Sequence, residues 1–154
     1  MTIKSRAIIA TAVFCGTCVG IHLNNPGNIM NEPGLHFIGE SKPYGRRDTF
    51  ISPELGYRAM SMVLLHYNTL PNCCSLSQVI TRYAPPNENP TRNYINFVAK
   101  ECDFTTWSHL NLQKENVLFP LVKAMAKFEQ GKSFHDSDET ILRGVRMALH
   151  DSRN

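Results

Sequence analysis

The sequence lacks the short motifs that identify several common enzyme classes. It has no Gly-x-Ser-x-Gly nucleophile elbow and no glycine-rich phosphate loop, which argues against an α/β-hydrolase or a nucleotide-dependent enzyme. His-Glu-x-x-His is absent, and the 6 histidines show no ligand spacing. No Cys-x-x-Cys pair is matched by a second pair or a histidine pair, so a zinc site is not expected. The sequence predicts neither a metal nor a cofactor.

The sequence also has only a small excess of positive charge. The 154 residues carry a net charge of +3 and are 19% charged, well short of the basic composition of a dedicated nucleic-acid-binding protein. Arg46-Arg47 is a lone basic pair, so no nucleic-acid partner is expected. No fixed-period repeat is visible, and 42% hydrophobic residues suffice for the core of one domain.

Long apolar runs are missing except at the N-terminus. Lys4 and Arg6 precede an uncharged stretch over residues 7–21, which is shorter than the roughly 20 residues that span a bilayer. A short basic region followed by a short apolar one is typical of a secretory signal. We therefore expect residues 1–21 to be a signal or weak anchor that contacts the inner membrane through residues 7–21, and residues 22–154 to be the functional domain. A buried N-terminal helix is the alternative.

The cysteine count is 5, which is odd. Cys15 and Cys18 would share a helix face, and Cys73 and Cys74 are adjacent. Export would permit disulfides, and Cys102 paired with Cys73 or Cys74 is one candidate, although spacing does not determine the connectivity.

Caps, prolines and apolar periodicity predict a mainly helical chain. Helices are expected from Pro53 to about Tyr67, from the Ser75–Gln78 capping box to about Tyr83, after Asn89-Pro90-Thr91, over 117–128 with Pro120 in the first turn, and from 136–139 to about His150. Residues 35–40 and 48–51 are short strand candidates joined as a loose hairpin. The predicted class is mainly α with a small β region (α+β).

Three clusters could carry chemistry. The Asn24, Asn25 and Asn28 side chains lie in a turn-forming segment and could present amides to a sugar, or they could only stabilise that turn. Glu129 ends an apolar helix beside Phe128, where the helix dipole and desolvation would raise its pKa, as protonation of a glycosidic oxygen requires. A solvated glutamate is the alternative.

The third cluster is a proline-stiffened corner. Tyr83, Glu88 and Tyr94 flank it and could bind sugar by stacking and hydrogen bonds, or could serve capping and packing alone.

Four ordered motifs resemble a known family. Asn24-Asn25-Pro26-Gly27-Asn28-Ile29 is followed by Phe50-Ile-Ser-Pro-Glu54-x-Gly56-x-Arg58-Ala59, by Arg82-Tyr83-Ala-Pro-Pro-x-Glu88-Asn-x-Thr91-x-x-Tyr94-Ile95, and by Glu129-x-Gly131. The set resembles the phage and prophage "NNPGNI" proteins, often described as phage structural or lytic-transglycosylase-like. The resemblance implies a phage protein that acts on bacterial peptidoglycan.

A looser resemblance is to the lysozyme superfamily. There a Glu-x-Gly helix precedes a small β lobe, an Asn-rich loop and a later Thr-x-x-Tyr segment, whereas here Glu-x-Gly comes last. This order implies a circularly permuted lysozyme-like arrangement, with Glu129 beside the Asn24–Asn28 loop in space. A non-permuted arrangement leaves Glu32, Glu40 or Glu54 as the acid.

These resemblances imply an enzyme of host lysis or wall penetration. The N-terminus is similar to the signal-arrest-release anchors of phage endolysins, in which a cysteine can re-pair after release. We expect a peptidoglycan glycosidase, either a muramidase or a lytic transglycosylase, in the host periplasm or inner membrane. Glu129 would be catalytic, and Asn24, Asn25, Asn28, Tyr83, Glu88 and Tyr94 would bind the glycan. The alternative is a non-catalytic virion or wall-binding protein.

Overall fold

The computed structural model describes residues 23–154. These residues form α2 (Pro53–Tyr67), α3 (Leu76–Tyr83), α4 (Thr91–Cys102), α5 (Glu115–Gln130), the short 3₁₀ helix η1 (Gly131–Ser133) and α6 (Asp138–Asp151). The predicted signal or anchor over residues 1–21, with Cys15 and Cys18, lies outside the described residues.

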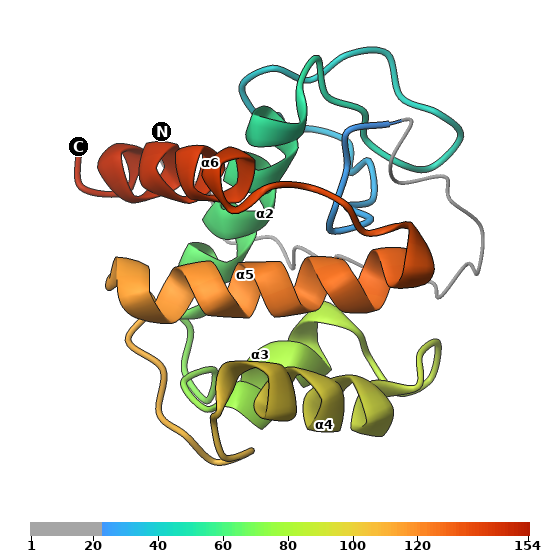
Figure 1. Ribbon diagram of the computed structural model, residues 1–154. Helices are drawn as coiled ribbons and strands as arrows, with labels where there is room; N and C mark the ends of the chain where they lie inside the picture. The colour runs from blue at the N-terminus through green and yellow to red at the C-terminus, as the bar shows by residue number, and fades with distance from the viewer. Residues whose placement is uncertain (1–22) are drawn as a thin grey trace.

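Helix α5 lies at the centre of the molecule. In Figure 1 it runs between α2 and α6 on one side and α3 and α4 on the other. Its buried side chains come from several sides of the helix, because it contacts both layers: Leu118, Leu121, Val122, Ala124, Met125, Ala126 and Glu129. The C-terminal end of α5 lies beneath the loops of residues 23–51, which we call the lobe (Figure 1).

The predicted starts of three helices are confirmed by their caps. The Ser52 hydroxyl accepts a hydrogen bond from the Leu55 N–H before α2, the Ser75–Gln78 capping box opens α3, and Ser137 caps α6. Each cap satisfies a backbone N–H that has no partner inside its helix.

Two helix starts differ from the prediction. Pro90 occupies the N-cap position of α4, and the Asn89 side chain donates instead to the Pro85 carbonyl at 3.1 Å. Helix α5 begins at Glu115, so Pro120 lies inside the helix and not in its first turn. A proline there has no N–H for the i−4 carbonyl, a cost that the burial of α5 on both sides offsets.

The prediction of a lysozyme-like α+β fold with a small β region is wrong, and the permuted form of that fold is withdrawn with it. Helix accounts for 52% of the described chain and strand for only 5%, with no sheet. The expected strands at 35–40 and 48–51 meet only in isolated bridges, such as Glu40 with Phe50. Gly39 and Gly45 adopt positive φ between the bridges and bend the backbone away from an extended ladder.

The cysteines within residues 23–154 are free thiols, so the pairing of Cys102 with Cys73 or Cys74 is not formed. The Cys102 thiol donates to the Pro120 carbonyl at 3.3 Å, and burial raises its pKa to about 12. Cys73 is 1% exposed and belongs to the core. Neither thiol is activated as a nucleophile.

Close packing of α6 on α2 depends on Gly144. A Cβ atom added there would lie 2.6 Å from the Glu54 carbonyl oxygen and 2.9 Å from the Arg58 nitrogen, both backbone atoms of α2. The same interface holds an ion pair between the buried Arg58 and Asp151, with a nitrogen–oxygen distance of 2.6 Å.

We therefore predict that Gly144→Ala destabilises the protein by about 1–3 kcal/mol, although alanine favours a helix more than glycine does. The reason is that the added Cβ atom would meet backbone atoms of α2, which cannot move aside as the end of a flexible side chain could. Urea unfolding of the variant measures the loss. Arg143→Ala, at the exposed neighbouring position, is the control and should change stability by only a few tenths of a kcal/mol. Equal stability of the two variants would contradict the close packing.

Candidate functional site

Glu129 lies in the last turn of α5, and Gly131, with φ of 55°, follows the helix. Its side chain faces the lobe and not solvent, and the residue is 9% exposed. The Asn28 amide donates to Oε2 of Glu129 at 3.0 Å. Oε1 is buried and accepts no hydrogen bond from the residues that the structure describes.

The environment of Glu129 favours the protonated carboxyl group. Burial, which disfavours the charged form, is the largest cause and raises the pKa from 4.5 to about 7. The Asn28 hydrogen bond, the Tyr94 hydroxyl and the positive charge of Arg47 each lower the pKa but do not offset the burial. A carboxyl group with such a pKa can both donate and accept a proton near neutral pH.

The asparagines of the lobe have different roles. Asn24 donates to the Phe50 carbonyl at 2.8 Å, and Asn25 donates to the carbonyls of Ile29 and Asp48, both at 2.9 Å. Asn24 and Asn25 therefore hold the loop together, whereas the Asn28 side chain contacts Glu129. The expected proximity of Glu129 and the Asn24–Asn28 loop is confirmed.

Two buried tyrosines complete the surroundings of the acid. Tyr83 donates to the Gly27 carbonyl at 2.5 Å and thereby fixes the residue before Asn28. The Tyr94 hydroxyl donates to the Met125 carbonyl at 3.4 Å, and its ring stacks on Phe128 with centroids 4.0 Å apart. Burial and the charge of Glu129 raise both phenol pKa values, so the hydroxyls stay neutral hydrogen-bond donors.

Glu88 is not brought to this cluster. It lies in the exposed turn between α3 and α4, where its N–H donates to the Pro85 carbonyl. Arg47, by contrast, is near enough to Glu129 to affect its pKa, although the sequence analysis did not propose it. It pairs with Met30 in an isolated bridge, a contact that no local pattern indicates.

Other parts of the described surface form cavities away from Glu129. Two surface cavities of about 360 Å³ have linings that do not include Glu129: Asn72, Cys73, Ser77, Gln78, Thr81 and Arg82 line one, and Glu115, Arg146, Leu149, His150, Arg153 and Asn154 line the other. Within residues 23–154, no group of three His, Cys, Asp or Glu side chains could hold a metal ion. None of the helices over this range has the length and apolarity to cross a membrane.

The pKa of Glu129 predicts how stability depends on pH. The unfolded chain releases this proton near pH 4.5 and the folded chain near pH 7, so the folded state binds more protons between these values and stability falls as pH rises through that window. The change amounts to roughly 3 kcal/mol. Glu129→Gln, which cannot ionise, should abolish this contribution. Urea unfolding of both proteins at pH 5 and pH 8 measures it, and identical pH slopes would contradict the raised pKa.

No protein-family model matches the sequence. Protein P5 of Pseudoalteromonas phage PM2 is 30% identical over 163 aligned positions, which cover 96% of this chain and 98% of the relative. The match supports a phage protein, and it does not support membership of the NNPGNI family or the lysozyme superfamily. The name of the relative gives no enzymatic or lytic role. Because the similarity spans nearly the whole of both chains, this chain belongs to the family of phage proteins that includes Protein P5 of phage PM2.

Proposed function

We propose that the protein cleaves the glycan strands of bacterial peptidoglycan, with Glu129 as the general acid. One observation carries the proposal. Burial raises the pKa of a carboxyl group to about 7, Asn28 donates a hydrogen bond to Oε2, and the buried Oε1 has no hydrogen-bond partner among residues 23–154. Glycoside cleavage requires such an acid, because the departing sugar oxygen must receive a proton as its bond to carbon breaks.

The proposed reaction uses the free oxygen of the carboxyl group. Protonated Oε1 donates its proton to the glycosidic oxygen, and the electrons of the breaking C1–O bond pass to that oxygen. The remaining sugar becomes oxocarbenium-like. The carboxylate of Glu129 then accepts a proton from the hydroxyl group that attacks C1, which restores the acid. In the closed site Asn28 donates to Oε2 and orients the carboxyl group, so it is a positioning residue.

The electrostatics favour a lytic transglycosylase over a muramidase with two carboxylates. The charged group that shifts the pKa of Glu129 is Arg47, and no other carboxylate of the described chain is among the causes of the shift. A partner carboxylate at the short distance typical of glycosidase pairs would raise the pKa by charge repulsion. Attack by the sugar's own O6 hydroxyl needs no second carboxylate and forms a 1,6-anhydro product.

Access to the acid imposes a condition on this mechanism. Oε1 of Glu129 is buried, so a glycan oxygen can reach it only when the covering residues move. The Asn28 side chain crosses from the lobe to α5 by one hydrogen bond, whereas Asn24 and Asn25 are bonded within the lobe. Opening at Asn28 therefore breaks fewer interactions than unfolding of the lobe does.

The overall charge and the proposed location agree with a wall substrate. A net charge of +3 favours association with the anionic wall. Export through residues 1–21 would bring the domain to the host periplasm or inner membrane, and incorporation into the virion would bring it to the wall from outside. Either route suits a phage protein of lysis or wall penetration.

The second candidate is a non-catalytic virion or wall-binding protein. The complete burial of Oε1 favours it, because Glu129 would then serve only to join α5 to the lobe. This candidate predicts binding to purified sacculi without release of muropeptides, so product analysis separates the two functions.

Glu129→Gln tests the proposal. We expect the wild-type chain to release 1,6-anhydro muropeptides from sacculi and the variant to lose at least about 100-fold of this rate, the usual contribution of a general acid. Activity should fall as pH rises through about 7, because the reacting form is protonated. Glu139→Gln, at an exposed carboxylate on α6, is the matched control and should keep its rate. Unchanged release by Glu129→Gln would refute the assignment.

Asn28→Gly tests the positioning role. Glycine tolerates the φ of 50° at this position but removes the amide that lowers the pKa of Glu129. The pH above which activity falls should therefore be higher in this variant than in the wild type. Asn24→Gly is the matched comparison, because Asn24 has the same φ but donates to Phe50. Asn24→Gly should lower the stability of the fold without changing the pH above which activity falls. Equal shifts in both variants would assign the effect to the backbone.

A further inference from the structure

The exposed hydrophobic side chains are concentrated in the lobe. The large hydrophobic residues exposed among the described residues are Ile38 (59%), Tyr44 (65%), Ile51 (70%) and Trp107 (79%), and the first three belong to the lobe. Isolated exposed hydrophobic residues need no explanation, whereas a group of them rimmed by polar residues is typical of an interaction surface.

Basic side chains accompany these residues. The tip of the lobe, which we define as residues 41–46, is exposed throughout and contains Lys42 and Arg46 but no acidic residue. Two acids lie next to the tip but outside it. Glu40 accepts a hydrogen bond from the Phe37 N–H, and Asp48 is buried and accepts a hydrogen bond from Asn31. The exposed residues 41–46 therefore carry two positive charges and no negative charge.

The local geometry keeps the two isoleucines outside. The Ile51 N–H donates to the Gly39 carbonyl at 3.0 Å, so Ile38 and Ile51 belong to adjoining segments at the base of the tip. A Cβ atom at Gly39 would lie 2.4 Å from Leu55, which shows that this segment already rests on α2. Reciprocal backbone hydrogen bonds between Tyr44 and Arg47 close the tip.

The described chain begins beside this surface. The Leu23 carbonyl accepts a hydrogen bond from the Phe50 N–H at 2.9 Å, next to the exposed Ile51. The uncharged run over residues 7–21 ends just before Leu23 in the sequence. The described chain therefore starts next to Ile51, shortly after an uncharged run in the sequence.

We propose that the lobe docks on an anionic lipid bilayer, with Ile38, Tyr44 and Ile51 entering the interface and Lys42 and Arg46 pairing with anionic headgroups. Apolar burial and attraction to anionic lipid add in such binding, and tyrosine favours the interfacial depth. A nucleic acid could contact the basic side chains of the tip and the ring of Tyr44, but it offers no apolar phase for Ile38 and Ile51. The bilayer uses all of these side chains.

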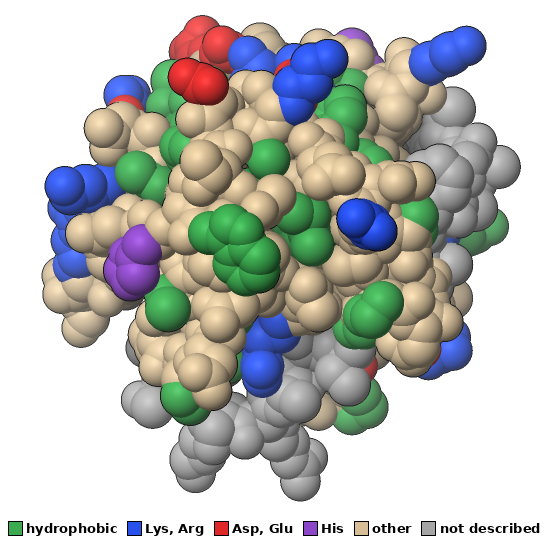
Figure 2. Space-filling view, turned by 90° about the horizontal axis from the view of Figure 1, so that it is seen from below, with side chains coloured by type: hydrophobic (Ala, Val, Ile, Leu, Met, Phe, Trp, Pro, Cys, Tyr) green, Lys and Arg blue, Asp and Glu red, His purple; other side chains and the backbone are tan. Residues whose placement is uncertain are grey.

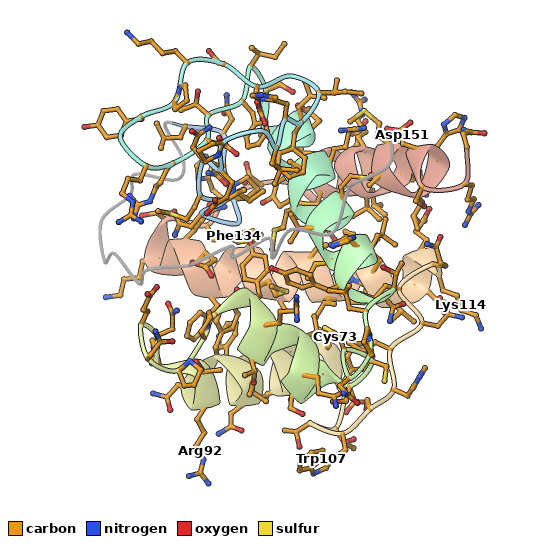
Figure 3. The ribbon with its side chains drawn as sticks, turned by 180° about the vertical axis from the view of Figure 1, so that it is seen from behind. Cys73, Arg92, Trp107, Lys114, Phe134 and Asp151 are labelled. Carbon is orange, nitrogen blue, oxygen red and sulfur yellow. The ribbon has the colours of Figure 1, made fainter. Side chains whose placement is uncertain are left out.

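The opposite end of the molecule provides an internal comparison. Trp107 lies at the end far from the lobe, beyond α3 and α4 (Figure 3). Figure 2, seen from below, shows hydrophobic side chains on that side as separate patches. Trp107 is thus at least as exposed as the lobe residues but belongs to another part of the surface.

Flotation of the full chain with vesicles tests the proposal. Vesicles of phosphatidylglycerol and phosphatidylcholine should retain the wild-type protein, and pure phosphatidylcholine should retain about tenfold less. Lys42→Gln/Arg46→Gln and Ile38→Ser/Ile51→Ser should each lower retention on the anionic vesicles about tenfold. Trp107→Ser is the control and should bind as the wild type does. All variants keep residues 1–21, so differences report on the lobe.

Trypsin accessibility gives an independent readout. Anionic vesicles should slow cleavage after Arg46 in the tip and leave cleavage after Lys114, which lies away from the lobe, unchanged (Figure 3). Wild-type retention of both double variants, or an equal loss in Trp107→Ser, would overturn the proposal. Protection of Arg46 by duplex DNA but not by vesicles would overturn it in favour of nucleic acid.

Discussion

The hydrogen bond between Asn28 and Glu129 joins the two parts of this molecule, a lobe made of loops and a body made of helices. The residues are 101 positions apart, one in a lobe without a sheet and the other at the end of the central helix α5. The lobe can hold Asn28 in place because side-chain hydrogen bonds to backbone carbonyls do the work of the backbone hydrogen bonds of a sheet. Asn24 and Asn25 bind backbone carbonyls within it, and Tyr83 binds the Gly27 carbonyl from below. The site therefore depends on a loop held by amides and a phenol.

Burial of Glu129 has opposite effects on stability and reactivity. Removing the carboxyl group from water raises its pKa to about 7, which keeps a proton available for transfer. The same burial makes the ionised form costly, and the unpartnered Oε1 adds to that cost. A glutamate kept only for packing could be replaced by an uncharged residue at lower cost. Local conflicts of this kind are expected at functional sites.

The helices could be predicted from the sequence because their signals are local. Ser52, Ser75 and Ser137 lie a few residues from the N–H groups that they cap, so the pattern and the interaction coincide. The structure of the lobe could not be predicted in this way. The segment that suggests a hairpin contains glycines with positive φ, and whether it forms a β-ladder or isolated bridges depends on its packing against α2. For the acid, the position of Glu129 before Gly131 was informative, whereas the neighbourhood of Arg47 depends on tertiary contacts alone.

Three consecutive residues of the lobe, 46–48, link its exposed tip to the surroundings of Glu129. Arg46 lies in the exposed tip, and Arg47, next to it, pairs with Met30 and influences the charge of Glu129. The following residue, Asp48, supplies a carbonyl that holds Asn25. Displacement of the tip by a surface would therefore act on both the charge beside Glu129 and the loop that carries Asn28. In the proposed function, a substrate reaches the buried Oε1 of Glu129 only when the residues that cover it move. Contact at the tip and access to the acid would then involve the same short segment of backbone.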